Sequence, residues 1–557
     1  MLFLLVGCPL LFAHHTPHAD NRQDDYQNGK DGICEQLVAP HLAAKVQKSW
    51  EFGSSCTVFF FAGCGFCVNL PKTLGSLTES SYLCTMIADE LSFRMRQHFG
   101  HVPTAEQNSA IDTVAAFLAD RSPHAVMLLR GSAGTGKTTL AAAIVGALLS
   151  LKQKLMLLAP TGRAAKVFAL YAHQPAYTIH RRIYRQRSAG DLSAFALNDN
   201  LYHDTLFIID EASMISATST DNNFGSGSVL DDLVRFVYSG QNCRMLLIGD
   251  QAQLPPVGEE QSPALVAEVL RGYGLSVYEA TLSEVLRQSQ QSGILFNATH
   301  IRAMLEAGDD QLPCIRFQGF ADIVSVPGDE LIESLASSYS HVGHDETMVV
   351  TRSNKRANIY NHGIRNTILD REEELCRGDQ LMIVKNNYFW TQQTKGELPF
   401  LANGDRCVVQ RVRHVHDLYG FRFADITFTL PDYDDYELTA TALLTTLSTE
   451  APALSREQQE QLYLRVMEDY ADMPLKQDRI KALRADAHYN AVQLKFGYAV
   501  TCHKAQGGQW AHVYIDQGYM TDDMLSPDYF HWLYTALTRA TEKVFLVNWP
   551  ATQTCPD

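Results

Sequence analysis

The chain has 557 residues, of which 46% are hydrophobic, and its net charge is −16. This length predicts about three or four domains, each with its own core. The acidic balance excludes a protein that coats polyanions with its whole surface, although a channel inside an acidic shell can still be basic. No apolar run approaches the roughly 20 residues that span a bilayer, so we expect no membrane-spanning segment.

The first 85 residues differ from the rest in composition, because they hold six of the twelve cysteines. Residues 1–13 form an apolar run like the core of a signal peptide, but no basic residues precede it. The pair Cys64 and Cys67 has no second pair at zinc-site spacing, so a chance pair is favoured over a metal site. We therefore expect residues 1–85 to lie outside the functional fold, with Met86 as the natural start of a cytoplasmic protein.

A glycine-rich loop, Gly131–Thr138, fits the phosphate-binding pattern G-x-x-x-x-G-K-[ST]. The apolar run 125–129 predicts a strand before it, and the Ala- and Leu-rich run 140–151 predicts a helix after it. In that order the backbone amides point at phosphate groups, Lys137 supplies a charge, and the Thr138 hydroxyl is placed to bind Mg²⁺. The expected ATP-binding residues are Gly131, Ala133, Gly134, Thr135, Gly136, Lys137, Thr138 and Thr139.

Two further apolar strands are predicted to end in polar residues. Residues 206–209 lead directly into Asp210 and Glu211, and parallel strands place such side chains at the edge where α/β sheets bind ligands. Asp210 would hold Mg²⁺, and Glu211 would orient or deprotonate the attacking water. Residues 244–249 predict a third strand, after which Gln253 is placed to sense the γ-phosphate or, alternatively, caps a turn.

Between these strands, residues 183–200 predict a hairpin that turns at 189–191. Four arginines at 181, 182, 185 and 187 make it basic, which suits either a phosphate track or an ordinary solvated surface. Later in the chain, residues 347–351 and 354–365 predict a strand and a helix, and residues 497–500 resume the sheet. Short strands over 378–384, 403–409 and 421–428 interrupt this sheet. A capping box at Ser455 opens a helix whose apolar stripe predicts packing.

In order along the chain, several of these segments resemble the motifs of superfamily 1 helicases, closest to the RecD-like and phage Dda-like branch of superfamily 1B. They are Gly131–Thr138, Ala159–Gly162, Asp210–Ser213, Gly249–Leu254, Leu282–Gln288, Thr501–Gly507 and Tyr534–Ala540. The resemblance implies an α/β fold with two tandem RecA-like P-loop motor domains and a small SH3-like β-barrel insert in the second. The expected ranges are 86–285 for the first domain, 286–378 and 491–557 for the second, and 379–490 for the insert.

The resemblance also implies roles for single residues. Gln107 matches an adenine-reading glutamine, and Arg287 and Arg539 match cations that stabilise charge on the γ-phosphate during catalysis, alongside Lys137, Asp210, Glu211 and Gln253. Related motors carry a duplex-splitting pin at the position of the 183–200 hairpin, with Phe195 as a stacking tip. The expected nucleic-acid contacts are Thr161, Thr178, His180, Phe195, Thr501 and His503. Without the resemblance, Thr178–His180 is equally an ordinary helix cap.

The function implied is an ATP- and Mg²⁺-dependent 5′-to-3′ DNA helicase, working as a monomeric motor on single-stranded DNA and at duplex junctions. Two alternatives stay open. A nucleic-acid-stimulated ATPase that translocates or remodels without unwinding would keep every ATPase motif but lack a competent pin. A P-loop ATPase without a polynucleotide ligand would show no stimulation by single strands.

Overall fold

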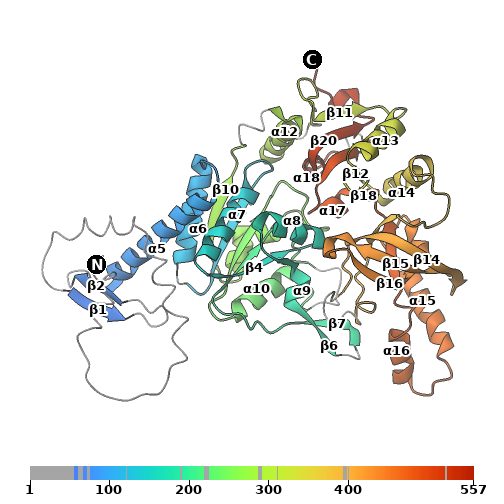
Figure 1. Cartoon of the computed structure of the whole chain (residues 1–557), viewed down its shortest axis with the longest axis horizontal. Coiled ribbons are helices and arrows are strands. Elements are labelled where there is room, and N and C mark those ends of the chain that lie inside the picture. Colours follow the sequence, from blue (N-terminus) through green and yellow to red (C-terminus); the bar gives the residue numbers. More distant parts are fainter. Residues whose placement is uncertain are drawn as a thin grey trace.

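The computed structural model describes the chain apart from residues 1–55, 61–66, 72–75, 121, 189–190, 219–224, 286–290, 310, 393–397, 399, 521–523 and 557. For residues 56–60, 67–71, 76–83, 186–188 and 191–195 it describes the backbone only. Figure 1 shows two α/β units, the second at the upper right, and a barrel below the second. None of the helices in these described ranges has the length and apolar character needed to cross a bilayer.

The first unit is a six-stranded parallel sheet in the order β10-β3-β9-β8-β4-β5. Its central strands are mostly apolar because helices cover both faces, as in β3, where Val126 and Leu128 join one core cluster and Met127 and Leu129 another. The strands are β3 (Ala125–Gly131), β4 (Lys154–Ala159), β5 (Ala176–Thr178), β8 (Thr205–Ile209), β9 (Arg244–Gly249) and β10 (Ser276–Leu282). The helices are α6 (Ala105–Ala119), α7 (Lys137–Ser150), α8 (Gly162–Ala172), α9 (Ile179–Ile183), α10 (Val229–Ser239) and α11 (Ala267–Gly272).

The segment before this unit contains a hairpin, β1 (Cys56–Phe60) with β2 (Cys67–Pro71), and a long helix, α5 (Ser76–His98). Helix α5 packs on α6 and α7, and its Met95 side chain is fully buried in the core of the first unit. The expected boundary at residue 85 therefore falls inside a continuous helix, because the apolar face of α5 is needed to cover α6 and α7.

The second unit is a five-stranded parallel sheet in the order β11-β20-β19-β12-β18. The predicted arrangement of two parallel-sheet RecA-like units is thus confirmed. The strands are β11 (Ile323–Val326), β12 (Thr347–Thr351), β18 (Ala499–Thr501), β19 (Trp510–Asp516) and β20 (Ala540–Val547). The helices are α12 (Gly293–Ala307), α13 (Leu331–His341), α14 (Asn354–Gly363), α17 (Cys502–Ala505) and α18 (Pro527–Leu537).

Between β12 and β18 the chain forms a closed five-stranded barrel, which confirms the predicted barrel insert. Its strands are β13 (Gln380–Ile383), β14 (Arg406–Leu418), β15 (Phe421–Leu430), β16 (Tyr436–Leu443) and β17 (Val492–Phe496). Strand β17 lies beyond residue 490, where the expected insert ends, and it belongs to the barrel because it pairs with both β13 and β16. Helices α15 (Arg456–Asp469) and α16 (Lys476–Arg484) lie between β16 and β17, and Val466 of α15 is fully buried against the barrel, as the apolar stripe predicts.

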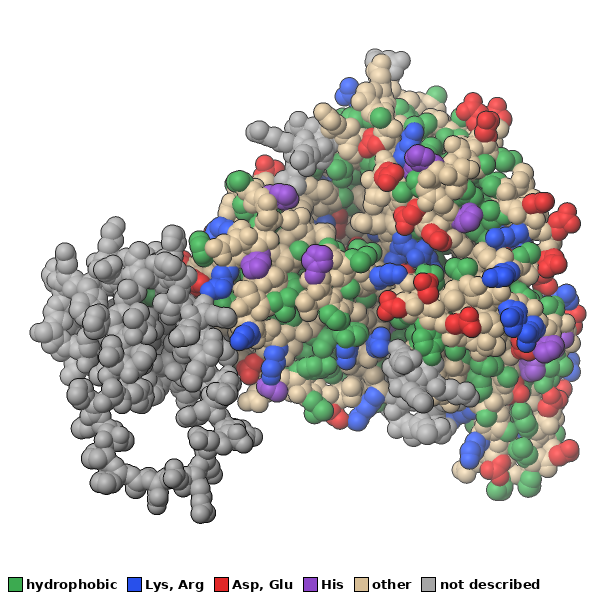
Figure 2. Space-filling model, in the orientation of Figure 1, with side chains coloured by type: hydrophobic (Ala, Val, Ile, Leu, Met, Phe, Trp, Pro, Cys, Tyr) green, Lys and Arg blue, Asp and Glu red, His purple; other side chains and the backbone are tan. Residues whose placement is uncertain are grey.

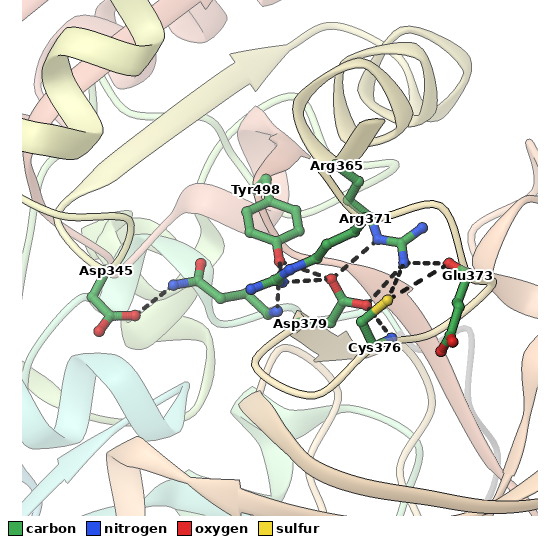
Figure 3. A network of polar contacts seen from close by, with 8 residues as sticks. Asp345, Arg365, Arg371, Glu373, Cys376, Asp379 and Tyr498 are labelled. Atoms are coloured by element: carbon green, nitrogen blue, oxygen red, sulfur yellow. Dashed lines mark hydrogen bonds and ion pairs between the residues drawn. The ribbon is translucent and has the colours of Figure 1, made fainter. Parts of the chain in front are cut away.

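A buried carboxylate joins the barrel to the second unit (Figure 3). Asp379, directly before β13, is fully buried and accepts hydrogen bonds from Arg365 at 3.0 and 3.1 Å and from Arg371 at 2.7 Å. The Tyr498 hydroxyl, at the return of the chain from β17 to β18, donates to the same carboxylate at 2.9 Å. The exit into the barrel and the return from it therefore meet at one side chain, which fixes how the barrel is mounted.

Candidate active site

The glycine-rich loop runs from the end of β3 to the start of α7 and has a backbone that only glycine adopts easily. Gly134 and Gly136 have φ values of 76° and 85°, and a Cβ on Gly131 would lie 2.8 Å from Cγ of Lys137. The Lys137 ammonium donates to the carbonyls of Gly131 at 2.5 Å and Ser132 at 2.9 Å, and lies 3.6 Å from a carboxylate oxygen of Asp250. The loop thus brings an ammonium and the first turn of α7, including Thr138 and Thr139, to one edge of the sheet.

Asp210 and Glu211 follow β8 at this same edge. Asp210 accepts a hydrogen bond from the Tyr171 hydroxyl of α8 and one from its neighbour's backbone N–H at 2.9 Å. Glu211 has a φ of 52°, a left-handed conformation that is strained for this residue. Burial raises the pKa of both carboxyls, and the Lys137 charge opposes that shift in both. The carboxylates are therefore held in a desolvated position next to the phosphate-binding loop.

The donor set fits a nucleotide with a divalent cation. Gly131–Thr138 supplies backbone amides and an ammonium, and carboxylate oxygens like those of Asp210 are ligands that Mg²⁺ prefers. Gln253, which is 5% exposed, has a buried Oε1 without a hydrogen-bond partner among the described residues. An unpaired buried acceptor of this kind costs free energy unless a ligand or water pairs with it.

The second RecA-like unit is bonded to this edge through α18. The Tyr534 hydroxyl accepts from the N–H of Ala133 at 2.8 Å and donates to Asp250 at 2.7 Å. One residue on, the Thr535 hydroxyl accepts from the N–H of Leu254 at 2.7 Å. Gln506, after α17, donates to the Leu254 carbonyl at 2.6 Å. The phosphate-binding loop and the segment after β9 are thus hydrogen-bonded to the opposite domain.

Of the two predicted catalytic arginines, the structure describes only Arg539. Arg539 is 3% exposed and donates to the carbonyls of Thr535 at 3.0 Å and Gly508 at 3.2 Å. Its charge lowers the pKa of Glu211, against the larger effect of burial, so it acts electrostatically across the interface. Arg287 lies outside the described residues. Arg302 of α12, which the sequence did not single out, hydrogen-bonds to the Ser132 hydroxyl of the loop.

Gln107 contacts the phosphate-binding loop directly. Its side-chain amide donates to the Thr135 carbonyl at 2.9 Å, and its Oε1 accepts from the Thr104 N–H at 2.9 Å as half of a capping box. Both ends of this amide are therefore bonded within the protein, and reading an adenine would require it to exchange a partner. Its role as an adenine reader stays a prediction.

The predicted strand contacts lie on both RecA-like units. The Thr161 hydroxyl caps α8 and the Thr178 hydroxyl caps α9, accepting from backbone N–H groups at 3.2 and 3.3 Å. The His180 ring meets Phe400, in the loop between β13 and β14, edge-on, with ring centroids 6.5 Å apart, and burial lowers the pKa of His180 to about 4. On the second unit, Thr501 is the last residue of β18, and the exposed His503 lies in α17.

The two sides approach each other closely at Thr161, because a Cβ on Gly507 would lie 3.0 Å from its hydroxyl oxygen. The second unit therefore reaches one predicted contact residue of the first unit, while the roles of all these residues stay predictions.

The predicted hairpin is present as β6 (Tyr184–Ser188) paired antiparallel with β7 (Asp191–Leu197). The side chain of Phe195 lies outside the described residues. Tyr171, Arg302 and Tyr534 are additional side chains of the site. Only Tyr534 carried a signal in the sequence, since it opens one of the helicase-like segments, whereas Tyr171 and Arg302 reach the site from helix positions with no local pattern.

Two family models match the chain: an AAA domain over residues 103–309 and a UvrD-like helicase C-terminal domain over residues 496–547. The ATP-dependent RecD2 DNA helicase of Deinococcus radiodurans is 30% identical over 158 residues, which are 28% of this chain and 20% of that protein. The ATP-dependent DNA helicase dda of phage T4 is 23% identical over 300 residues, which are 53% of this chain and 63% of that protein. The chain thus spans less than two thirds of either relative.

A solved structure of the Pif1 helicase from Bacteroides, in complex with ADP-AlF3 and single-stranded DNA, is 15% identical, with a TM-score of 0.41 over 82% of this chain and 95% of that one. The matched models cover the glycine-rich loop, both carboxylates and the α17–α18 segment that reaches across to them. With its two parallel-sheet RecA-like units and barrel insert, the chain is related to the superfamily 1B helicases RecD2 and Dda.

Proposed function

We propose that the chain is an ATP-dependent DNA helicase that moves 5′-to-3′ on single-stranded DNA and unwinds duplexes at a junction. The observation that carries the proposal is the hydrogen bond from Ala133, in the phosphate-binding loop, to Tyr534 of the second RecA-like unit. Because of this bond, a change at the loop when ATP binds or is hydrolysed bears directly on the contact between the two units. Both curated relatives are named ATP-dependent DNA helicases, which supports the same activity.

The residues of the site divide the chemistry among them. Lys137 binds the β- and γ-phosphates, and Thr138 and Asp210 hold Mg²⁺, which neutralises charge that develops on the phosphates. Glu211 orients and deprotonates the attacking water, for which a raised pKa is suited. Arg539 stabilises the transferred phosphoryl group from the second unit, together with Arg287.

Gln253 senses the γ-phosphate, a role supported by its unpaired buried oxygen. The strand crosses both units over Thr161, Thr178, His180, Thr501 and His503, held through its phosphates so that movement does not depend on sequence. The β6–β7 hairpin separates the complementary strand. These assignments connect hydrolysis in the interface with movement of a strand across it.

The test measures ATP hydrolysis with and without single-stranded DNA, and unwinding of duplexes with a 5′ or a 3′ single-stranded tail. We expect stimulation by the strand and unwinding of the 5′-tailed duplex, both abolished in Lys137→Ala. The control variant Lys481→Ala, at an exposed lysine of α16, should behave as wild type. Hydrolysis that no single strand stimulates would refute the proposal, and unwinding only from a 3′ tail would refute the polarity.

Shortening the hairpin 184–197 separates unwinding from translocation. If the hairpin splits the duplex, the shortened protein retains strand-stimulated hydrolysis and loses unwinding. If wild type hydrolyses ATP with a strand but unwinds neither tailed duplex, the chain is instead a translocating or remodelling ATPase.

A further inference from the structure

A small, partly open cavity lies where the barrel meets the second RecA-like unit. Four elements line it: α14, β13, β17 and the turn from β18 into α17. Its polar lining residues include Asn354, Asn358, Lys495, Thr501 and Lys504. Thr501 is one of the predicted strand contacts, so the cavity adjoins the proposed track.

The cavity is cationic. Lys495, on β17, is 8% exposed and donates to the Thr449 carbonyl, while Lys504, on α17, donates to the Asn403 side chain in the barrel. Within the described part of the chain, neither ammonium lies within 4.0 Å of a carboxylate, and the lining residues include no acid. Two lysines of this kind place uncompensated positive charge beside one cavity.

Two described acids on flanking segments are paired with other cations. Glu450 lies 3.6 Å from Lys355, and Asp516 lies 2.7 Å from Arg356. Burial lowers the pKa of Lys495 to about 8, and burial together with the charge of Lys495 lowers the pKa of Lys504 to about 8. Burying like charges without a counter-charge is unfavourable, and a bound anion would relieve that cost.

Other features of the cavity also favour an anion. Each ammonium group has three N–H donors. Among the described residues, each of the two ammonium groups donates to only one acceptor, which leaves donors for a ligand. One side of α14 also lines the cavity, with the side chains of Asn354 and Asn358. Figure 2 shows Lys and Arg side chains gathered in a hollow near the middle of the face, where Figure 1 places α17 and β18.

We propose that Lys495 and Lys504 form a phosphate site at the junction of the barrel and the second RecA-like unit, occupied by a backbone phosphate of the bound strand. This inference rests on the proposed function. It makes β17 of the barrel part of the strand track, since Lys495 would bind the same phosphate as Lys504. The site reads charge and not bases, so it would hold any sequence equally.

The test measures how single-strand affinity of the full chain, without nucleotide, depends on salt, in wild type, Lys495→Gln and Lys504→Gln. One phosphate contact contributes about 0.7 to the slope of log K against log salt. Since both lysines bind the same phosphate, each variant should lose up to about 0.7 of that slope, equivalent to up to about fivefold weaker binding at 0.1 M salt. Lys495→Arg should keep the wild-type slope, and the control Lys481→Gln, which removes an exposed charge on α16, should keep it too.

Thermal unfolding separates this role from a structural one. Removing one of two repelling buried charges should leave the melting temperature of Lys495→Gln unchanged or raise it, whereas loss of a structural lysine would lower it. If Lys495→Gln does not fold, the less buried Lys504→Gln decides the test by its slope.

The outcomes that overturn the inference are distinct. If wild type binds the strand and both Gln variants keep its slope, the phosphate site is refuted while the proposed helicase stands. If inorganic phosphate stabilises wild type but not Lys495→Gln, and the slopes are equal, the site takes a free anion and not the strand. If wild type binds no strand, the proposed function fails, and the strand assignment fails with it.

Discussion

The contact between the two RecA-like units depends on the hydroxyl of Tyr534, and the substitution Tyr534→Phe removes that hydroxyl without changing the shape of the ring. Two hydrogen bonds are lost: one from the Ala133 N–H and one to the Asp250 carboxylate. A bond to a charged group contributes about 1.5–3 kcal/mol and a neutral one about 0.5–1.5 kcal/mol. Together the contact should weaken by about 2–4 kcal/mol, which raises the population of the open interface at least about 30-fold.

Hydrogen exchange of the backbone amides measures this opening. In Tyr534→Phe, peptides covering 132–135 and 250–254 should exchange at least about 30-fold faster, because their protection depends on the closed interface. The control is Tyr529→Phe on the same helix, which removes a buried hydroxyl bonded at 2.6 Å to Gln517 inside the second unit. It should leave those peptides unchanged. Equal exchange in Tyr534→Phe and wild type would show that this hydroxyl does not hold the units together.

Three further predictions concern the mounting of the barrel and His180. Asp379→Asn leaves the buried Arg365 and the partly buried Arg371 without their counter-charge and should cost about 3–5 kcal/mol in urea unfolding. Asp417→Asn, at an exposed ion pair, should cost about 1 kcal/mol or less, and equal midpoints would contradict the role of the joint. The pKa of His180 is about 4 in the folded protein and about 6.5 in the unfolded chain. Its contribution to the free energy of unfolding is therefore complete above pH 6.5 and is lost as the pH falls towards 4, by at most about 3 kcal/mol. His180→Gln should remove this part of the pH dependence of stability. Gly162→Ala places a Cβ 2.9 Å from Asp405 and from Tyr433 of the barrel and should lower the melting temperature, while Gly363→Ala, with open space around it, should be neutral or raise it.

Those parts of the fold that are encoded locally could be predicted from the sequence. The glycine-rich loop needs residues that adopt positive φ, and the strand before Asp210 needs an unbroken apolar run, so both are visible in a few consecutive residues. The insert was recognised from three of its five strands. Strand β16 is not predicted by the sequence. An acidic turn at 432–435 precedes it, and its residues alternate between more and less exposed positions only in the first half of the strand.

The contacts that complete the site could not be predicted, since each joins residues far apart in the chain. Tyr171 reaches Asp210 from the far end of α8, and Arg302 reaches Ser132 from another unit. The Asp379 joint likewise depends on Tyr498, which only the closed barrel brings back to it. Such contacts follow from the packing of whole elements, and no spacing in the sequence marks them.

The insertion of the barrel between β12 and β18 has a consequence for how the protein is made. All strands of the first sheet lie within residues 125–282, so that sheet can assemble while the rest of the chain is still being synthesised. The second sheet cannot, because Val349 of β12 pairs with Ala499 of β18, beyond the whole insert. During synthesis, both edges of β12 therefore stay unpaired until the residues after the barrel have been made. In this interval the nascent chain is most exposed to misassembly.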